Sequence, residues 1–162
     1  MFNGVKRRKT RQVRVGRLFC GSDYPVSIQS MTKTDTRNVA STVAQINKLA
    51  AEGCEIIRVA VLDIEAARAI RDIKKEITIP LEADIHFNPA LAVESIHSGA
   101  DCIRLNPGNI SDKMSLKEIL REACERDISI RVGVNSGSLP VSGGRRYKNT
   151  ALAMADAAAR HI

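Results

Sequence analysis

Charged and amide side chains recur near the carboxyl ends of four apolar segments that we expect to be β-strands. The residues are Arg58, Asp84, His86, Arg104, Asn106, Arg131 and Asn135. Side chains two positions apart share one face of a strand, so the spacing places Asp84 with His86 and Arg104 with Asn106. Three guanidiniums that meet at one place predict a site for a polyanion. A diphosphate suits them best, because each guanidinium can bond two phosphate oxygens at once.

The same place offers acid/base groups and two loops that suit an anion. Asp84 and His86 can transfer protons, so we assign them as candidate catalytic residues without deciding which is the acid. The loops at residues 106–109 (NPGN) and 135–138 (NSGS) are built from small and amide residues, which let backbone N–H groups approach an anion. Turns use the same residue types, so the loops are evidence for an anion site only together with the arginines. The alternatives are a surface position for one arginine and a purely structural role for His86.

Hydrophobic periodicity predicts alternating strands and helices from residue 24 onward. The expected strands cover residues 25–29, 55–61, 80–85, 102–105 and 128–134, and the expected helices cover residues 39–52, 63–75, 89–99, 115–126 and 151–161. Asp63 caps the second helix, and Ser115 with Glu118 forms a capping box for the fourth. A flat sheet between helices is apolar on both faces, so the repeated polar residues favour the interior of a barrel. We therefore expect an α/β fold, a partial (β/α)8 TIM barrel of about five strand–helix units.

The net charge of +7 is concentrated at the amino terminus of the 162-residue chain. Seven basic residues precede the first acidic residue, Asp23: Lys6, Arg7, Arg8, Lys9, Arg11, Arg14 and Arg17. The rest of the chain is formally neutral. We expect a basic arm at residues 1–23, in which VRVGRLF forms a short hairpin that closes a barrel floor, and a barrel domain at residues 24–162. No apolar run approaches the length of a membrane span, so a membrane is not an expected partner.

The cysteines and two of the histidines suggest no chemistry of their own. Cys20, Cys54, Cys102 and Cys124 lack CxxC or CxC spacing and resemble small buried hydrophobes of a reducing compartment. They predict neither a disulfide framework nor a metal site made by this chain alone. His97 and His161 are expected to be solvated or locally hydrogen-bonded.

Four segments carry a family resemblance: QSMT (29–32), ADIHF (83–87), IRLNPGNI (103–110) and IRVGVNSGSL (130–139). From about Thr10 to its end the chain resembles 4-hydroxy-3-methylbut-2-enyl diphosphate synthase, an iron–sulfur enzyme of the methylerythritol phosphate route to isoprenoids. The resemblance implies a TIM barrel that binds 2-C-methyl-D-erythritol 2,4-cyclodiphosphate at its carboxyl-terminal rim. It also implies reductive ring opening with a 4Fe-4S cluster and with electrons from flavodoxin or ferredoxin, in the bacterial cytoplasm. The seven residues singled out above would contact the substrate.

The sequence departs from this family in its extent. A full barrel takes about 250 residues, whereas this chain stops before the sixth strand, where the family places a substrate lysine. The cluster domain with its paired cysteines is absent, so we expect an N-terminal fragment that lacks the cluster ligands and is inactive alone. The first and fifth strands would then leave open sheet edges, which predicts a homo-oligomer.

Two other functions fit parts of the sequence. A phosphate-binding TIM-barrel transferase resembling dihydropteroate synthase would share the barrel and the anion site, but its pterin-binding motifs are not seen. A nucleic-acid binder would depend on the basic residues 6–17. Aromatic residues make up only 3% of the chain and leave few stacking surfaces for bases, so nucleic acid is not an expected partner.

Overall fold

The computed structural model describes residues 7–86, 88–106, 110, 112–135, 139 and 149–159. Its elements, in chain order, are β1 (Val13–Val15), β2 (Leu18–Cys20), β3 (Gln29–Met31), α1 (Val39–Ala51), β4 (Ile56–Val61), α2 (Ile64–Glu76), β5 (Leu81–Ile85), α3 (Pro89–His97), β6 (Cys102–Leu105), α4 (Lys113–Glu125), β7 (Ser129–Val132) and α5 (Thr150–Ala159). No described helix is long and apolar enough to cross a membrane.

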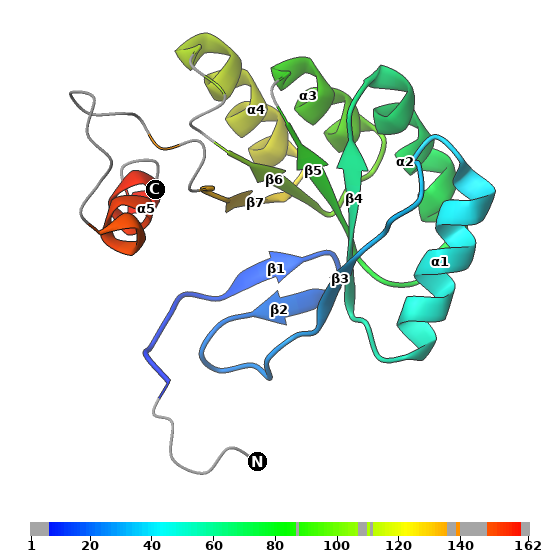
Figure 1. The fold of residues 1–162 in the computed structure, drawn as a ribbon, viewed down its shortest axis with the longest axis horizontal. Coiled ribbons are helices and arrows are strands. Elements are labelled where there is room, and N and C mark those ends of the chain that lie inside the picture. Colours follow the sequence, from blue (N-terminus) through cyan, green and yellow to red (C-terminus); the bar gives the residue numbers. More distant parts are fainter. Residues whose placement is uncertain are drawn as a thin grey trace.

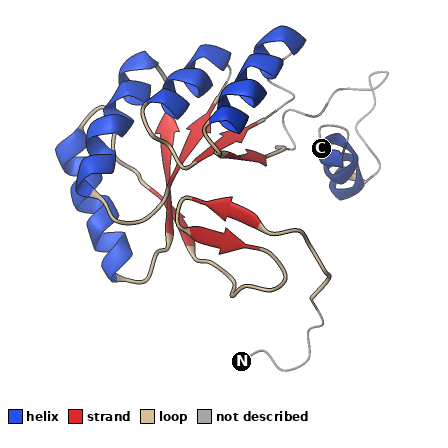
Figure 2. Ribbon diagram, turned by 180° about the vertical axis from the view of Figure 1, so that it is seen from behind, coloured by secondary structure: helices blue, strands red, loops and turns tan. Residues whose placement is uncertain are grey.

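The five strands β3 to β7 form one parallel sheet in the order of the sequence. Helices α1 to α4 lie together on the outer face of this sheet, and the hairpin of β1 and β2 lies on the other side (Figures 1 and 2). Parallel strands in sequence order, with helices on one side only, are the arrangement of a barrel wall. The expected α/β class is therefore confirmed.

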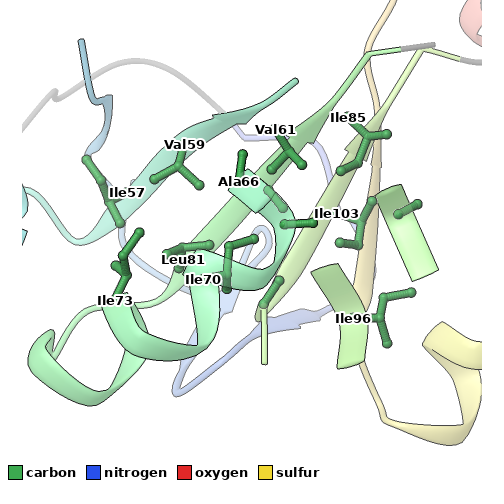
Figure 3. Packing of buried hydrophobic residues seen from close by; sticks show 14 of the residues in the cluster. Ile57, Val59, Val61, Ala66, Ile70, Ile73, Leu81, Ile85, Ile96 and Ile103 are labelled. Atoms are coloured by element: carbon green, nitrogen blue, oxygen red, sulfur yellow. The ribbon is translucent and has the colours of Figure 1, made fainter. Parts of the chain in front are cut away.

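The outer face of the sheet is apolar because every second strand residue points toward the helices. Ile57, Val59 and Val61 of β4 are fully buried, as are Leu81 and Ala83 of β5. They pack against the inward face of α2, which contributes Ala66, Ile70 and Ile73 (Figure 3) together with Ala67. The alternation leaves the remaining strand side chains on the inner face, where the polar residues lie.

Local side chains fix where the helices begin. The carboxylate of Asp63 accepts a hydrogen bond from the Ala66 amide at 2.8 Å, which confirms the predicted cap of α2. The prediction for α4 was wrong, because the helix begins at Lys113 and its cap is Asp112 rather than Ser115. The Asp112 carboxylate accepts from two first-turn amides, and the Ser115 hydroxyl donates to it at 2.6 Å from inside the helix.

The ends of the strands differ from the expected ranges. Residues 25–28 are not a strand, and β3 begins only at Gln29. The Ile28 amide donates to the Glu55 side chain at 2.8 Å, so a carboxylate replaces the partner that a neighbouring strand would supply. Strand β7 ends at Val132 and not at residue 134, whereas β6 has the predicted bounds. The expected end of the last helix, residues 160–162, lies outside the described residues.

The predicted hairpin is confirmed and lies at the amino-terminal end of the sheet. Strands β1 and β2 pair antiparallel around a turn in which Gly16 has a φ of +56°. Val15 packs on the inner face against Ile56 and Cys102, the first residues of β4 and β6. A salt bridge between Arg14 and Asp127 joins the hairpin to the segment before β7. The hairpin thus covers the floor beneath the inner face.

Candidate active site

Three polar residues stand at one level on adjacent strands of the inner face. The strand register pairs Asp84 of β5 with Arg104 of β6, and Arg104 with Arg131 of β7. On the other side of β5, Asp84 pairs with Ala60, two residues after Arg58 on β4. The parity of the sequence therefore places all three arginines toward the barrel interior, as expected.

The Asp84 carboxylate lies between two guanidiniums. Its Oδ1 accepts from Arg104 Nη1 at 3.0 Å, and its Oδ2 lies 3.5 Å from Arg58 Nε. The Asp84 and Arg104 side chains are only 5% and 10% exposed, whereas that of Arg58 is 31% exposed. Arg104 Nη2 also approaches Asn135 Oδ1 at 3.4 Å. One buried carboxylate thus fixes the spacing of two arginines and leaves them with a net positive charge.

Arg58 is held more loosely than Arg104. Besides the long bridge to Asp84, its Nε and Nη2 point at the Met31 sulfur at 3.3 and 3.2 Å. A thioether is a weak acceptor. A phosphate oxygen that replaced this sulfur would give Arg58 a stronger, charge-assisted bond.

Arg131 belongs to a second cluster, around Glu82, that the sequence reasoning missed. Its Nη1 bonds Glu82 Oε2 at 2.9 Å, Glu82 Oε1 at 3.1 Å and Gln29 Oε1 at 2.5 Å. Gln29 Nε2 donates in turn to Glu82 Oε2 at 3.0 Å. The signal was present, because Glu82 precedes Asp84 by two residues and so shares its face. Gln29 ends the first expected strand and opens the QSMT motif, but it was not predicted as a site residue.

The contact between Gln29 and Arg131 also reveals the curvature of the sheet. Gln29 lies on β3 and Arg131 on β7, the two outermost strands of the sheet. Side chains on the two outer strands of a flat five-stranded sheet would be too far apart to bond, because neighbouring strands lie about 4.8 Å apart. The sheet must therefore be rolled around the interior, as a barrel wall is.

Arg104 lies against the backbone of β7 at Gly133. A Cβ atom added to Gly133 would stand 2.3 Å from Arg104 Nε and 2.9 Å from its Cζ. Gly133 does not have the positive φ that favours glycine, and its amide bonds the Leu105 carbonyl at 2.8 Å. An added Cβ would therefore displace the Arg104 guanidinium, so glycine here leaves room for that side chain.

The remaining predicted residues follow the strands directly. His86 comes immediately after β5, and the buried Asn106 immediately after β6. Of the two predicted anion loops, residues 107–109 and 136–138 lie outside the described residues.

Comparison with known proteins identifies the family. The family described as "GcpE TIM-barrel domain" matches residues 10–162. This chain belongs to that family. The match confirms both the partial TIM barrel and the resemblance drawn from the four motifs.

Curated relatives from several bacteria carry the name "4-hydroxy-3-methylbut-2-en-1-yl diphosphate synthase (flavodoxin)". The relative from Thermodesulfovibrio yellowstonii is 52% identical over 98% of this chain and 46% of its own length. The Clostridium perfringens relative is 48% identical, again over 98% of this chain and 46% of its own length. This chain therefore spans about half the length of the relatives it matches.

Solved structures of similar shape show the fold alone. A dihydropteroate synthase from Yersinia pestis is 12% identical, with a TM-score of 0.60 over 93% of this GcpE chain and 58% of its own. A structure of that enzyme with a pterine-sulfa conjugate is 13% identical, with a TM-score of 0.65 over the same shares. At such identity the likeness supports the barrel and does not support the transferase alternative.

The cysteines of this GcpE chain do not fit a 4Fe-4S cluster. All four are free thiols: Cys20 lies on β2, Cys54 between α1 and β4, Cys102 on β6 and Cys124 on α4. Within the described part of the chain, no three residues of metal-binding type lie together. Burial raises the pKa of the Cys102 thiol to about 12, so it stays protonated and is a poor metal ligand. Cys124 is exposed, so the expectation that all four are buried was wrong.

Proposed function

We propose that this chain is the substrate-binding barrel portion of a 4-hydroxy-3-methylbut-2-enyl diphosphate synthase. Its site would bind 2-C-methyl-D-erythritol 2,4-cyclodiphosphate at the carboxyl ends of the strands. The observation that carries the proposal is the set of three arginines on the inner face, two of them spaced by Asp84. The name of the curated relatives supports the same reaction.

The side chains of this site would hold and orient the cyclic diphosphate. Arg58, whose contacts are the weakest, is the guanidinium most easily turned to a phosphate oxygen. Arg104, with Asn135 at its Nη2 and Asn106 two residues after it, would bind the diphosphate from the other side of Asp84, and Arg131 from the neighbouring strand β7. Asp84 and His86 are the candidates for moving protons as the ring opens. Fixing the reacting carbons in one orientation is the main contribution a barrel of this kind can make.

The electrons of the reaction must come from a cofactor. Ring opening takes two electrons and removes one oxygen, and no side chain of the site supplies electrons. We propose that a 4Fe-4S cluster supplies them, that flavodoxin or ferredoxin reduces it, and that its ligands lie outside this chain, whose own cysteines do not converge. We further propose that the enzyme works in the cytoplasm of a bacterium.

Binding of inorganic pyrophosphate and of the cyclic diphosphate, measured by calorimetry, tests the proposal. Arg58→Met should weaken binding of both by about 10- to 100-fold, because a hydrogen bond to a charged group contributes about 1.5–3 kcal/mol. The control is Arg71→Met, at an exposed position on α2. Equal affinity of the two variants would refute the assignment of the site.

A further inference from the structure

Glu82 is a buried carboxylate that bonds two side chains from two other strands, Gln29 of β3 and Arg131 of β7. It is 2% exposed and lies one inward position before Asp84 on β5. Both of its oxygens contact the same nitrogen, Nη1 of Arg131, and Oε2 also accepts from the Gln29 amide. Gln29 contributes its own oxygen to that nitrogen, so the three side chains form a closed triangle.

The triangle fixes one edge of Arg131 and compensates its charge. All the contacts to Glu82 and Gln29 use Nη1, while the Arg131 side chain as a whole is 49% exposed and the Glu82 side chain only 3%. The Glu82 carboxylate is enclosed, whereas about half of the Arg131 side chain is exposed. An anion that approaches Arg131 from the solvent side therefore meets a guanidinium that already has a fixed negative partner behind it.

Glu82 differs in this respect from the other inner carboxylate. Asp84 is shared by two arginines, so that cluster keeps a net positive charge. Glu82 has a single ion-pair partner among the described residues and neutralises it. The repulsion between Glu82 and a bound diphosphate is not offset by a second guanidinium.

We propose that Glu82 is a positioning residue that holds Arg131 in place and, through its charge, lowers the affinity of the pocket for the diphosphate. This assignment rests on the proposed function. Substrate and product of the proposed reaction both carry a diphosphate. Weaker binding of that group therefore favours release of the product. It lowers the affinity for the substrate and for the transition state alike, so the barrier of the bound substrate is not raised.

Glu82→Gln separates the charge from the contacts. The glutamine has the same size and keeps an oxygen that can accept from Arg131, but it removes the negative charge. Its affinity for inorganic pyrophosphate, measured by calorimetry, should rise about tenfold, which corresponds to about 1.4 kcal/mol. The gain should shrink as salt is added, because added ions screen the restored charge of a half-exposed arginine. The matched control is Glu118→Gln, at an exposed position on α4, which should bind as the wild type does.

Glu82→Leu provides the second arm. It removes the charge and the hydrogen bonds together. The variant should fold, because the Arg131 guanidinium can turn toward solvent and is not left buried without a partner. Its affinity should exceed that of the wild type but stay below that of Glu82→Gln, because Arg131 is no longer held. A folded variant whose affinity is unchanged or lower at low salt would overturn the proposal. Absence of pyrophosphate binding in the wild type and in both variants would refute the proposed function as well.

Discussion

Replacing Asp84 by asparagine tests whether its buried carboxylate is the counter-charge that holds the arginine pair together. Asparagine keeps the shape of the side chain and one oxygen for Arg104 Nη1, but leaves a guanidinium that is 10% exposed without its counter-charge. Removing one partner of a buried ion pair costs about 3–5 kcal/mol. The retained hydrogen bond favours the low end of this range, and the bridge to the 31% exposed Arg58 adds little. We expect a loss of about 3 kcal/mol.

Urea unfolding followed by circular dichroism measures this loss. A domain typically has about 5–15 kcal/mol of stability, so the variant should still fold. With a slope of about 2 kcal/mol per molar urea, the midpoint should fall by about 1.5 M at an unchanged slope. Asp72→Asn, which breaks the exposed pair with Lys75 on α2, is the matched control and should not move the midpoint. Equal midpoints for Asp84→Asn and wild type would mean that water, and not Asp84, stabilises the positive charge of the two arginines.

Three further predictions follow from the same structure. Gly133→Ala should displace the Arg104 guanidinium and weaken pyrophosphate binding at least tenfold, about 1.4 kcal/mol, while circular dichroism stays native; the same change in an Arg104→Met background should have no effect on binding. The hydrogen bond from His97 lowers the pKa of Glu122 from its usual 4.5. This contact therefore stabilises the fold above about pH 4.5, and its contribution is lost as the pH falls through the lowered pKa. The stability of His97→Ala should accordingly fall less in acid than that of the wild type. Light scattering should detect species larger than 17.7 kDa, because β3 and β7 are the outer strands of the described sheet, and a monomer at all concentrations would contradict this.

Most elements of the fold could be predicted from the sequence because their signals are local. The alternation of apolar residues located β6 to the residue, and Asp63 marked the start of α2 through a bond to an amide three residues away. The errors came where a side chain competes with the expected pattern. Asp112 replaced Ser115 as the cap of α4, and the Glu55 carboxylate took the amide of Ile28 that a longer β3 would have used.

The candidate site, too, could be predicted only as far as local signals reach. Strand parity alone determined that Asp84, Arg104 and Arg131 face inward, because side-chain direction alternates along any strand. Parity does not determine which carboxylate each arginine meets. Arg131 bonds Gln29, 102 residues away in the sequence, only because the sheet rolls up and brings its two outer strands across the interior from one another. The division into an upper arginine pair around Asp84 and a lower triangle around Glu82 is therefore a property of register and curvature, which arise only when the whole sheet has formed.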